Sequence, residues 1–138
     1  MTDHLTKEKR SWNMSRIKSS DTKPEMQIRS FLHKQGFRFR LHRKDLPGKP
    51  DIVLPKYKTV IDVRGCFWHY HKNCKRSSLP ASNTAYWKNK LEGNVLRDKK
   101  HERDLKKLGW KVIVVWECSL NNRTFLTRLA NKIKMHNL

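Results

Sequence analysis

Residues 110–116 read WKVIVVW, an apolar run interrupted by one lysine. Such a near-continuous apolar run is typical of a β-strand that is buried on both faces. A strand of this kind needs a layer of packed structure on each side of its sheet. The run therefore predicts an α/β domain in which helices flank a mixed central sheet.

The other elements follow from periodicity and from start and stop signals. Thr22-Lys-Pro-Glu25 has the pattern of a capping box with a proline in the first turn, and Gly36 and Gly109 are expected to end two helices. Helices are predicted over residues 22–35, 83–108 and 122–136, and strands over residues 37–42, 51–54, 59–64 and 110–116. The order α-β-β-β-α-β-α indicates one domain, residues 22–138, after a polar arm, residues 1–21.

The composition is strongly basic, with 32 Lys and Arg against 12 Asp and Glu and a formal net charge of +20. A positive surface attracts polyanions, because each neutralised phosphate releases condensed counterions. Nucleic acid is the expected partner, and anionic lipid is the alternative. No apolar run approaches the roughly 20 residues that span a bilayer, and the N-terminus has no apolar signal core. We therefore expect a cytoplasmic protein without a membrane partner.

Two short sequences bring acidic residues to neighbouring strands. Pro50-Asp51 begins one strand, and Asp62-Val63-Arg64 ends the next, where Asp62 and Arg64 share a face. This is the Pro-Asp…Asp/Glu-x-Lys pattern of restriction-type nucleases, with arginine in the place of lysine. Two carboxylates can hold a divalent cation that polarises a phosphate and activates a water, and a nearby positive side chain offsets developing charge. The alternative is a turn acceptor, Asp51, beside an Asp62–Arg64 ion pair.

Two further acids are expected to point inward from helices. Glu25 shares the apolar face of the first helix with Ile28, although it also fits the capping box, and the two roles are compatible. Asp98 lies seven residues from both Leu91 and Leu105, on the inward stripe of the long helix. Carboxylates are rarely buried on such a stripe without a partner or a function. We therefore favour a role for Glu25 and Asp98 at the acidic site.

All three cysteines fit one metal site. The spacing Cys66-x4-His71-x2-Cys74, followed by Cys118, offers three thiolates and an imidazole, a set typical of closed structural zinc sites. Such a site would tie the irregular segment 65–82 to the end of the apolar strand. The alternatives are three buried inert thiols, or His69 in place of His71 as the ligand. A free His69 would lie next to the acidic face, where it is suited to proton transfer.

Large aromatic residues surround this cysteine-rich segment. Phe67 and Trp68 follow the first cysteine directly, and Trp87 opens the long helix. Aromatic side chains in a basic, irregular loop suit insertion between base pairs, and local packing around the metal is the alternative. In the arm, Met14 and Lys18 are further candidates for contact with DNA.

Taken together, these motifs resemble very short patch repair endonucleases over about residues 12–120. The motifs that carry the resemblance are Met14-Ser-x-Ile17, Asp21-Thr22-x-Pro24-Glu25, Pro50-Asp51, Gly65-Cys66-Phe67-Trp68-His69, Asn94-x-x-Arg97-Asp98, Gly109-Trp110 and Trp116-Glu117-Cys118. The resemblance implies a restriction-endonuclease-like α/β/α fold with a structural zinc site. It also implies a nick 5′ to the thymine of a T:G mismatch, which arises when 5-methylcytosine deaminates at a methyltransferase site.

The resemblance also assigns roles to residues. Asp51 would bind the catalytic metal and His69 would lie near the scissile phosphate, with Asp98 and Glu25 as supporting acids. The zinc ligands would be Cys66, His71, Cys74 and Cys118, and the aromatic wedge beside the mismatch would be Phe67, Trp68 and Trp87. This chain has Val63-Arg64 where familiar members have Thr-His. Val63 can still offer its main-chain carbonyl to a metal, but Arg64 can supply only charge, because arginine stays protonated.

We therefore predict a monomeric, Mg²⁺-dependent mismatch endonuclease, zinc-stabilised and nucleoid-associated in a bacterial-type cytoplasm. Its substrate would be double-stranded DNA, and it would be linked in function to a cytosine-5 DNA methyltransferase. In this interpretation Asp51 and Asp62 bind magnesium with Val63, and His69 transfers a proton. The alternative is a site-specific endonuclease of restriction or homing type with the same fold. A DNA-binding module without catalysis is disfavoured, because its inward-facing acids would weaken binding.

Overall fold

The computed structural model of the protein describes residues 21–135. Its centre is a four-stranded sheet in the order β1-β2-β3-β4. The strands are β1 (Arg40–Leu41), β2 (Ile52–Leu54), β3 (Thr59–Arg64) and β4 (Lys111–Trp116), and the helices are α2 (Lys23–Lys34), α3 (Thr84–Lys107) and α4 (Phe125–Met135). Neighbours β1, β2 and β3 are antiparallel, whereas β3 and β4 run parallel in register from Thr59–Lys111 to Arg64–Trp116. The expectation of a mixed sheet is confirmed.

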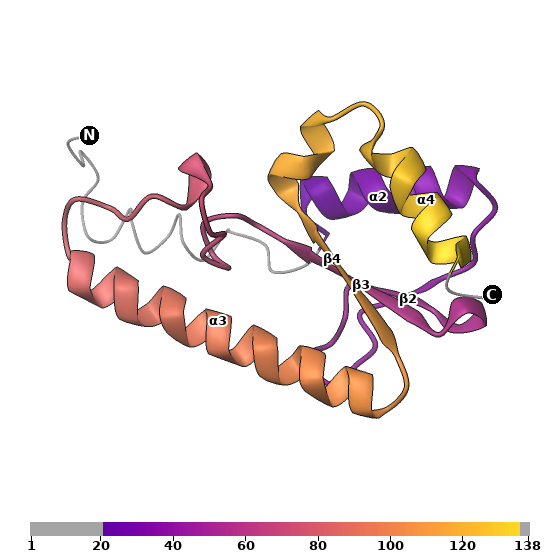
Figure 1. Cartoon of the computed structure of the whole chain (residues 1–138), viewed down its shortest axis with the longest axis horizontal. Coiled ribbons are helices and arrows are strands. Elements are labelled where there is room, and N and C mark those ends of the chain that lie inside the picture. Colours follow the sequence, from indigo (N-terminus) through magenta and orange to yellow (C-terminus); the bar gives the residue numbers. More distant parts are fainter. Residues whose placement is uncertain (1–20, 136–138) are drawn as a thin grey trace.

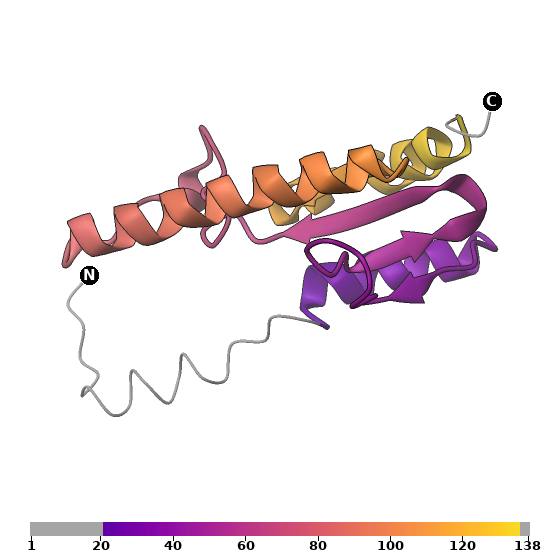
Figure 2. The same cartoon turned by 90° about the horizontal axis from the view of Figure 1, so that it is seen from below.

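Helices cover both faces of this sheet (Figures 1 and 2). On one face, α2 and α4 pack over a core whose members are Ile28, Leu32, Phe37, Ile52, Leu54, Ile61, Ile113, Val115, Leu129, Ala130 and Ile133. On the other face, α3 contributes Leu105 to a smaller cluster with Leu46, Val53, Val60 and Trp110. The two clusters draw alternate residues from each strand, as the pleat requires. The domain is thus an α/β/α sandwich.

The strand alternation also decides where the acidic pair lies. Val60 faces α3, so Asp62 and Arg64, which follow at intervals of two, face α3 as well. A hydrogen bond from Arg64 to Glu102 of α3 agrees with this placement. The prediction that Asp62 and Arg64 share a face is confirmed.

The predicted burial of residues 110–116 on both faces is wrong. Within the described residues β4 is an edge strand. Of residues 110–116, Ile113 and Val115 are buried on the α2–α4 side, and on the α3 side only Trp110 is buried. The strands that lie in the middle are β2, which is completely buried, and β3. The apolar run of β4 therefore reflects its half-buried second face, which α3 covers only in part.

The predicted strand over residues 37–42 is too long, because only Arg40–Leu41 pairs with a neighbour. Its partner β2 is only three residues long, and the pairs are Arg40 with Val53 and Leu41 with Ile52. Phe37 is nonetheless buried, against Tyr57 at 5.6 Å between ring centroids.

Other boundaries differ by a few residues. Strand β2 begins at Ile52, one residue after Asp51, and α3 begins at Thr84. The last helix begins at Phe125 rather than at Asn122, and a 3₁₀ turn, Glu117–Asn121, precedes it. Further 3₁₀ turns are Pro55–Tyr57 and Lys75–Ser77. Most of the predicted arm, with Met14 and Lys18, lies outside the described residues, and among those described no helix is long and apolar enough to cross a bilayer.

Candidate active site and metal centre

The acidic residues meet where β2 starts and β3 ends. Because these two strands are antiparallel, Asp51 lies beside the last residues of β3. Its Oδ2 atom accepts a hydrogen bond from the main-chain N–H of Val63 at 2.8 Å. The N–H and C=O of one strand residue point to the same side, so the Val63 carbonyl also points toward Asp51. The carboxylates of Asp51 and Asp62 thus lie together here, and the strand geometry directs the Val63 carbonyl to the same side.

The surroundings of the Asp51 carboxyl group disfavour its ionised form. Burial raises its pKa to about 8, the Val63 N–H opposes that rise, and the nearby carboxylates of Asp62 and Glu25 reinforce it. A bound cation would remove both penalties, because it replaces lost hydration and neutralises the repulsion. Oxygen donors of this kind suit a hard divalent ion such as Mg²⁺. The residues present therefore fit a divalent cation.

Arg64 lies at the centre of the acids on the α3 side. Its Nε donates to Asp62 Oδ2 and its Nη2 to Glu102 Oε1, each at 2.9 Å, and Asp98 Oδ2 is 4.0 Å from Nε. The sequence analysis did not identify Glu102. Its signal was available, because Glu102 follows Asp98 by four residues and so shares its face of the helix.

His69 and Asp98 form a hydrogen-bonded pair. His69 Nδ1 is 2.7 Å from Asp98 Oδ2. With Asp98 as a carboxylate, which can only accept, Nδ1 is the donor of this bond, and Nε2 is the ring nitrogen left to exchange a proton with substrate. One turn earlier on α3, Asn94 donates to the main-chain oxygen of Trp68 at 2.8 Å and holds the loop in place. The inward position predicted for Asp98 is confirmed.

Glu25 enters the same region from α2 and is 1% exposed. Its main-chain N–H donates to Thr22 Oγ1 at 3.4 Å, so the threonine caps the helix as predicted. The Glu25 carboxylate instead pairs with His42 Nε2 at 2.9 Å and with Arg29 at 3.3 Å. His42, whose φ of +47° is left-handed, was not identified from the sequence, which carries no signal for that backbone conformation.

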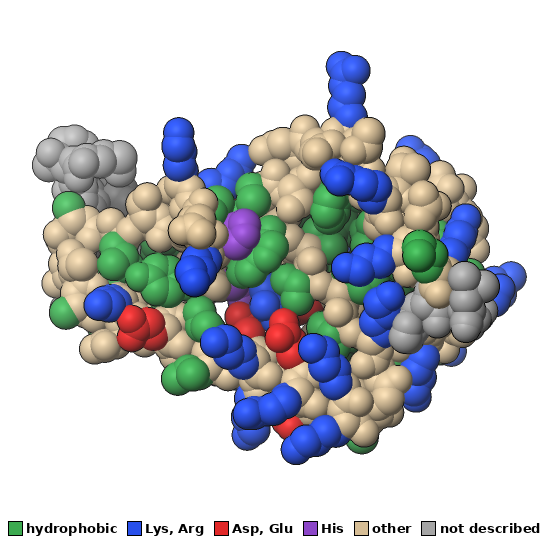
Figure 3. All heavy atoms as spheres, viewed as in Figure 1, with side chains coloured by type: hydrophobic (Ala, Val, Ile, Leu, Met, Phe, Trp, Pro, Cys, Tyr) green, Lys and Arg blue, Asp and Glu red, His purple; other side chains and the backbone are tan. Residues whose placement is uncertain are grey.

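The acids form a small island in a basic surface. Figure 3 shows Asp and Glu side chains gathered near the middle of one face, next to histidine, with Lys and Arg around them. A DNA backbone attracted by the surrounding cations would be brought toward this island. Tight carboxylate clusters in a chain of charge +20 are otherwise unfavourable for binding a polyanion.

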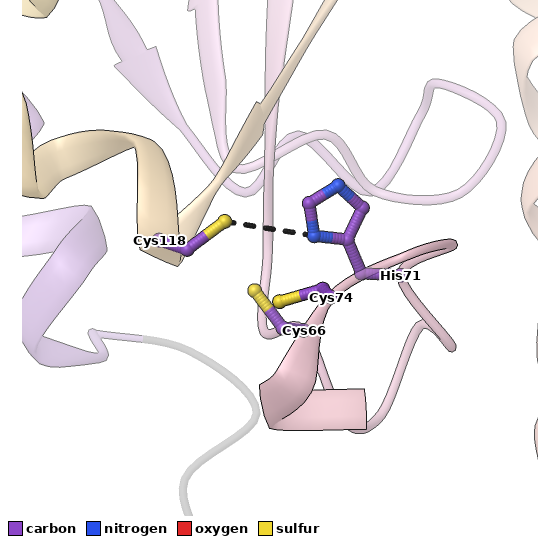
Figure 4. Close-up of side chains that lie close together, drawn as sticks. All are labelled: Cys66, His71, Cys74 and Cys118. Carbon is purple, nitrogen blue, oxygen red and sulfur yellow. Dashed lines mark hydrogen bonds between the residues drawn. The ribbon is translucent and has the colours of Figure 1, made fainter. Parts of the chain in front are cut away.

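The cysteine and histidine residues form a second centre (Figure 4). One ligand atom each from Cys66, His71, Cys74 and Cys118 lies within 4.8 Å of all the others. Cys118 Sγ and His71 Nδ1 are 3.6 Å apart, and the His71 ring stacks on Trp116 at 3.9 Å. Burial raises the pKa of the Cys66 thiol to about 12, so a thiolate there requires a cation. The set fits a tetrahedral metal site, and His71 rather than His69 belongs to it.

Three aromatic side chains stand together beside the His69 loop. The ring centroids of Phe67, Trp68 and Trp87 lie 5.2 to 6.0 Å apart in edge-to-face contacts. All three are half-buried, and Tyr86, which the sequence analysis did not identify, extends the cluster with 58% of its surface exposed. The rings pack against one another and keep part of their surface accessible, an arrangement suited to contact with bases.

Comparison with known proteins agrees with these features. The family model described as DNA mismatch endonuclease Vsr matches residues 2–76. The type II nicking enzyme V.NmeAIP of Neisseria meningitidis serogroup A is 51% identical and covers 97% of this chain and 98% of its own length. The type II nicking enzyme V.XorIIP of Xanthomonas oryzae pv. oryzae is 50% identical, covering 95% of this chain and 96% of its own.

The DNA mismatch endonuclease Vsr of Escherichia coli K12 is 43% identical and covers 92% of this chain and 81% of its own length. The resemblance seen in the sequence motifs is confirmed. The chain therefore belongs to the DNA mismatch endonuclease Vsr family, and it is a DNA endonuclease, a hydrolase that acts on DNA.

Proposed function

We propose that the chain is a Mg²⁺-dependent endonuclease of very short patch repair that nicks one strand of DNA 5′ to the thymine of a T:G mismatch. The proposal rests on one observation: Asp51, Asp62 and the hydrogen-bonded His69–Asp98 pair lie together beside an aromatic cluster. The sandwich of α2 and α4, the mixed sheet and α3 supports a restriction-endonuclease-like fold.

The ion would be held by the Asp51 and Asp62 carboxylates and the Val63 carbonyl. When bound there, Mg²⁺ polarises a phosphate oxygen and helps a water lose its proton. His69 Nε2 would move a proton at the scissile phosphate, while Asp98 keeps Nδ1 protonated and stabilises the charged ring. Arg64 would supply fixed positive charge. The negative charge of Glu25, which repels the Asp51 carboxylate, would favour binding of the cation at Asp51.

Zn²⁺ would occupy the centre formed by Cys66, His71, Cys74 and Cys118. Its role would be structural, because four protein ligands leave no open position. Three of these ligands lie in the segment that also carries the aromatic pair and His69, and Cys118 lies in the turn after β4. A metal there would fix the aromatic cluster and the proton-transfer histidine relative to the sheet.

Phe67, Trp68 and Trp87 would form the wedge that opens the DNA beside the mismatch. Insertion between base pairs costs a few kcal/mol of stacking, and least where the pairing is already faulty. Met14 and Lys18 of the arm would add contacts to the same DNA. A T:G pair arises when 5-methylcytosine deaminates, so the function of the enzyme would be linked to a cytosine-5 DNA methyltransferase. The enzyme would act as a monomer.

The test uses end-labelled duplexes that carry one T:G mismatch in varied flanking sequences, together with fully paired duplexes of the same sequence. Each is incubated with the purified chain, with and without added Mg²⁺. We expect a nick only in the thymine-containing strand of the mismatched duplex and only with Mg²⁺. Equal cleavage of both duplexes would reject mismatch specificity, and cleavage without a divalent ion would reject the metal role.

A second candidate is a site-specific endonuclease that cuts paired DNA, of restriction or homing type. The observation in its favour is that the relatives from Neisseria and Xanthomonas are named type II nicking enzymes. The paired duplexes in the same experiment decide between the two. Sequence-dependent cutting of a paired duplex would establish this second function.

A further inference from the structure

Arg64 is 7% exposed, yet it is surrounded by carboxylates from two elements. Its Nε binds Asp62 of β3 at 2.9 Å, and its Nη2 binds Glu102 of α3 at 2.9 Å. Asp98, also on α3, is 4.0 Å from Nε. The guanidinium group therefore bridges the sheet and the long helix, and it is the cation shared by three acids.

Such a group of carboxylates requires a cation. These three are partly buried, and partly buried carboxylates that lack a cationic partner repel one another and lose some of their hydration. With Arg64 between them, the oxygens of the three do not all lie within 4.8 Å of one another. Without Arg64, the side chains would close by small rotations around a hard divalent ion, which prefers oxygen donors. The Arg64 guanidinium can neutralise these carboxylates permanently, because arginine stays protonated. Its N–H donors point outward in one plane and so can reach several acids.

Asp51 differs from these acids. In the part of the chain that the structure describes, residues 21–135, no Lys, Arg or His nitrogen lies within 4.0 Å of its carboxylate. Its hydrogen-bond partner is the uncharged Val63 N–H. Asp62 accepts from Arg64 through Oδ2, so this carboxylate can still offer its other oxygen to an ion beside Asp51.

We propose that the Arg64 guanidinium occupies the place of a second divalent cation, so that this active site takes one divalent ion, at Asp51. Two-metal nuclease sites hold their ions about 3.5–4 Å apart between shared carboxylates. Here Asp62 is the shared carboxylate, with the ion on the Asp51 side and Arg64 on the α3 side. Glu102 is a positioning residue that holds Arg64 in this location. The inference rests on the metal site of the proposed function.

The test counts bound ions directly. Mn²⁺ is titrated into the zinc-containing protein without DNA, and free Mn²⁺ is followed by its electron paramagnetic resonance signal. We expect wild type to bind one Mn²⁺ and Asp51→Asn to lose it. Arg64→Gln should bind a second Mn²⁺, because Asp62 and Glu102 are then without their cation and Asp98 keeps only His69. Adding Glu102→Gln to Arg64→Gln should weaken this second site by about tenfold or more.

Arg43→Gln is the matched control. Arg43 also pairs with an aspartate two residues away, Asp45, at 2.6 Å, but on the exposed surface. Loss of that cation should leave the Mn²⁺ count at one, because the surface carboxylate stays hydrated and, among residues 21–135, belongs to no cluster of three or more metal-ligating side chains. Zinc content and circular dichroism verify that each variant is folded.

Each outcome decides a different statement. Two ions of similar affinity on wild type would overturn the inference, and so would a folded Arg64→Gln variant that still binds one. No Mn²⁺ on wild type would overturn the proposed metal site itself, and the inference with it. Where Arg64→Gln fails to fold, the count on wild type decides alone.

Discussion

The carboxyl group of Asp51 should make the metal-free protein less stable as the pH rises. Burial and the neighbouring carboxylates disfavour its ionised form in the folded state, so the folded chain binds this proton more tightly than the unfolded chain. The contribution to stability is fully present below the ordinary pKa of 3.8 and is lost as the pH rises toward about 8. Asp51→Asn removes the titration and should remove this loss.

The size of the effect follows from the same pKa. One pKa unit corresponds to about 1.4 kcal/mol, so the free energy of unfolding should fall by about 1.4 kcal/mol for each pH unit between pH 5 and pH 8. The total would be about 4 kcal/mol for a single isolated group. Because Asp62 and Glu25 share part of the repulsion, we expect a loss of about 2–4 kcal/mol relative to Asp51→Asn.

The assay is equilibrium unfolding in urea, followed by tryptophan fluorescence, at several pH values in buffers without added divalent ions. The other titratable groups are common to wild type and variant, so the difference isolates Asp51. Asp45→Asn is the control, because Arg43 lowers the pKa of that exposed carboxyl group by a hydrogen bond. Mg²⁺ at pH 8 should stabilise wild type and not Asp51→Asn. Parallel pH profiles for wild type and Asp51→Asn would refute the reasoning.

Three further predictions concern the metal centre, the proton-transfer pair and the aromatic cluster. Cys118→Ser should lower the zinc content and the free energy of unfolding together, because metal binding and folding are coupled; elemental analysis and urea unfolding check this, and full zinc occupancy would contradict it. Asp98→Asn should slow nicking by about 10²–10⁴-fold in single-turnover kinetics, with DNA binding retained. An unchanged rate would show that the His69–Asp98 pair takes no part in proton transfer. Trp68→Ala should weaken binding to the T:G duplex by about 1–3 kcal/mol in fluorescence anisotropy. An equal loss on paired DNA would limit Trp68 to packing.

The arrangement of the sheet could be predicted from the sequence better than the burial of its strands. Alternation and stop signals identified, in order, the four strands and three helices of residues 21–135, because these signals are local. The apolar run 110–116 suggested a strand buried on both faces, but among the described residues the strand lies at the edge of the sheet. Composition reports how much apolar surface a strand carries, whereas strand order depends on pairings distant in sequence. The short β1 is a similar case, because its length is set by β2.

Some residues of the candidate site could also be predicted from the sequence, and others could not. The cysteine spacing predicted the four residues that converge in the structure, because that ligand set has few alternatives in a chain with three cysteines. The inward position of Asp98 was also available from helical periodicity. His42 was missed, because it meets Glu25 only when β1 approaches α2. The face of Glu102 could be inferred from Asp98 one turn earlier, but its partner Arg64 reaches it only when α3 packs on β3. Charged residues on a long basic helix resemble an ordinary solvated face until the tertiary structure places a cation beside them.

The central claim is that Asp51 holds the ion that makes DNA cleavage possible. The most direct measurement compares nicking and binding of one T:G duplex by wild type and Asp51→Ala, side by side in Mg²⁺. We predict no nicking by the variant above the level seen without a divalent ion, together with equal or tighter binding, because a negative charge next to the DNA backbone is removed. Nicking by Asp51→Ala at the wild-type rate would contradict the account.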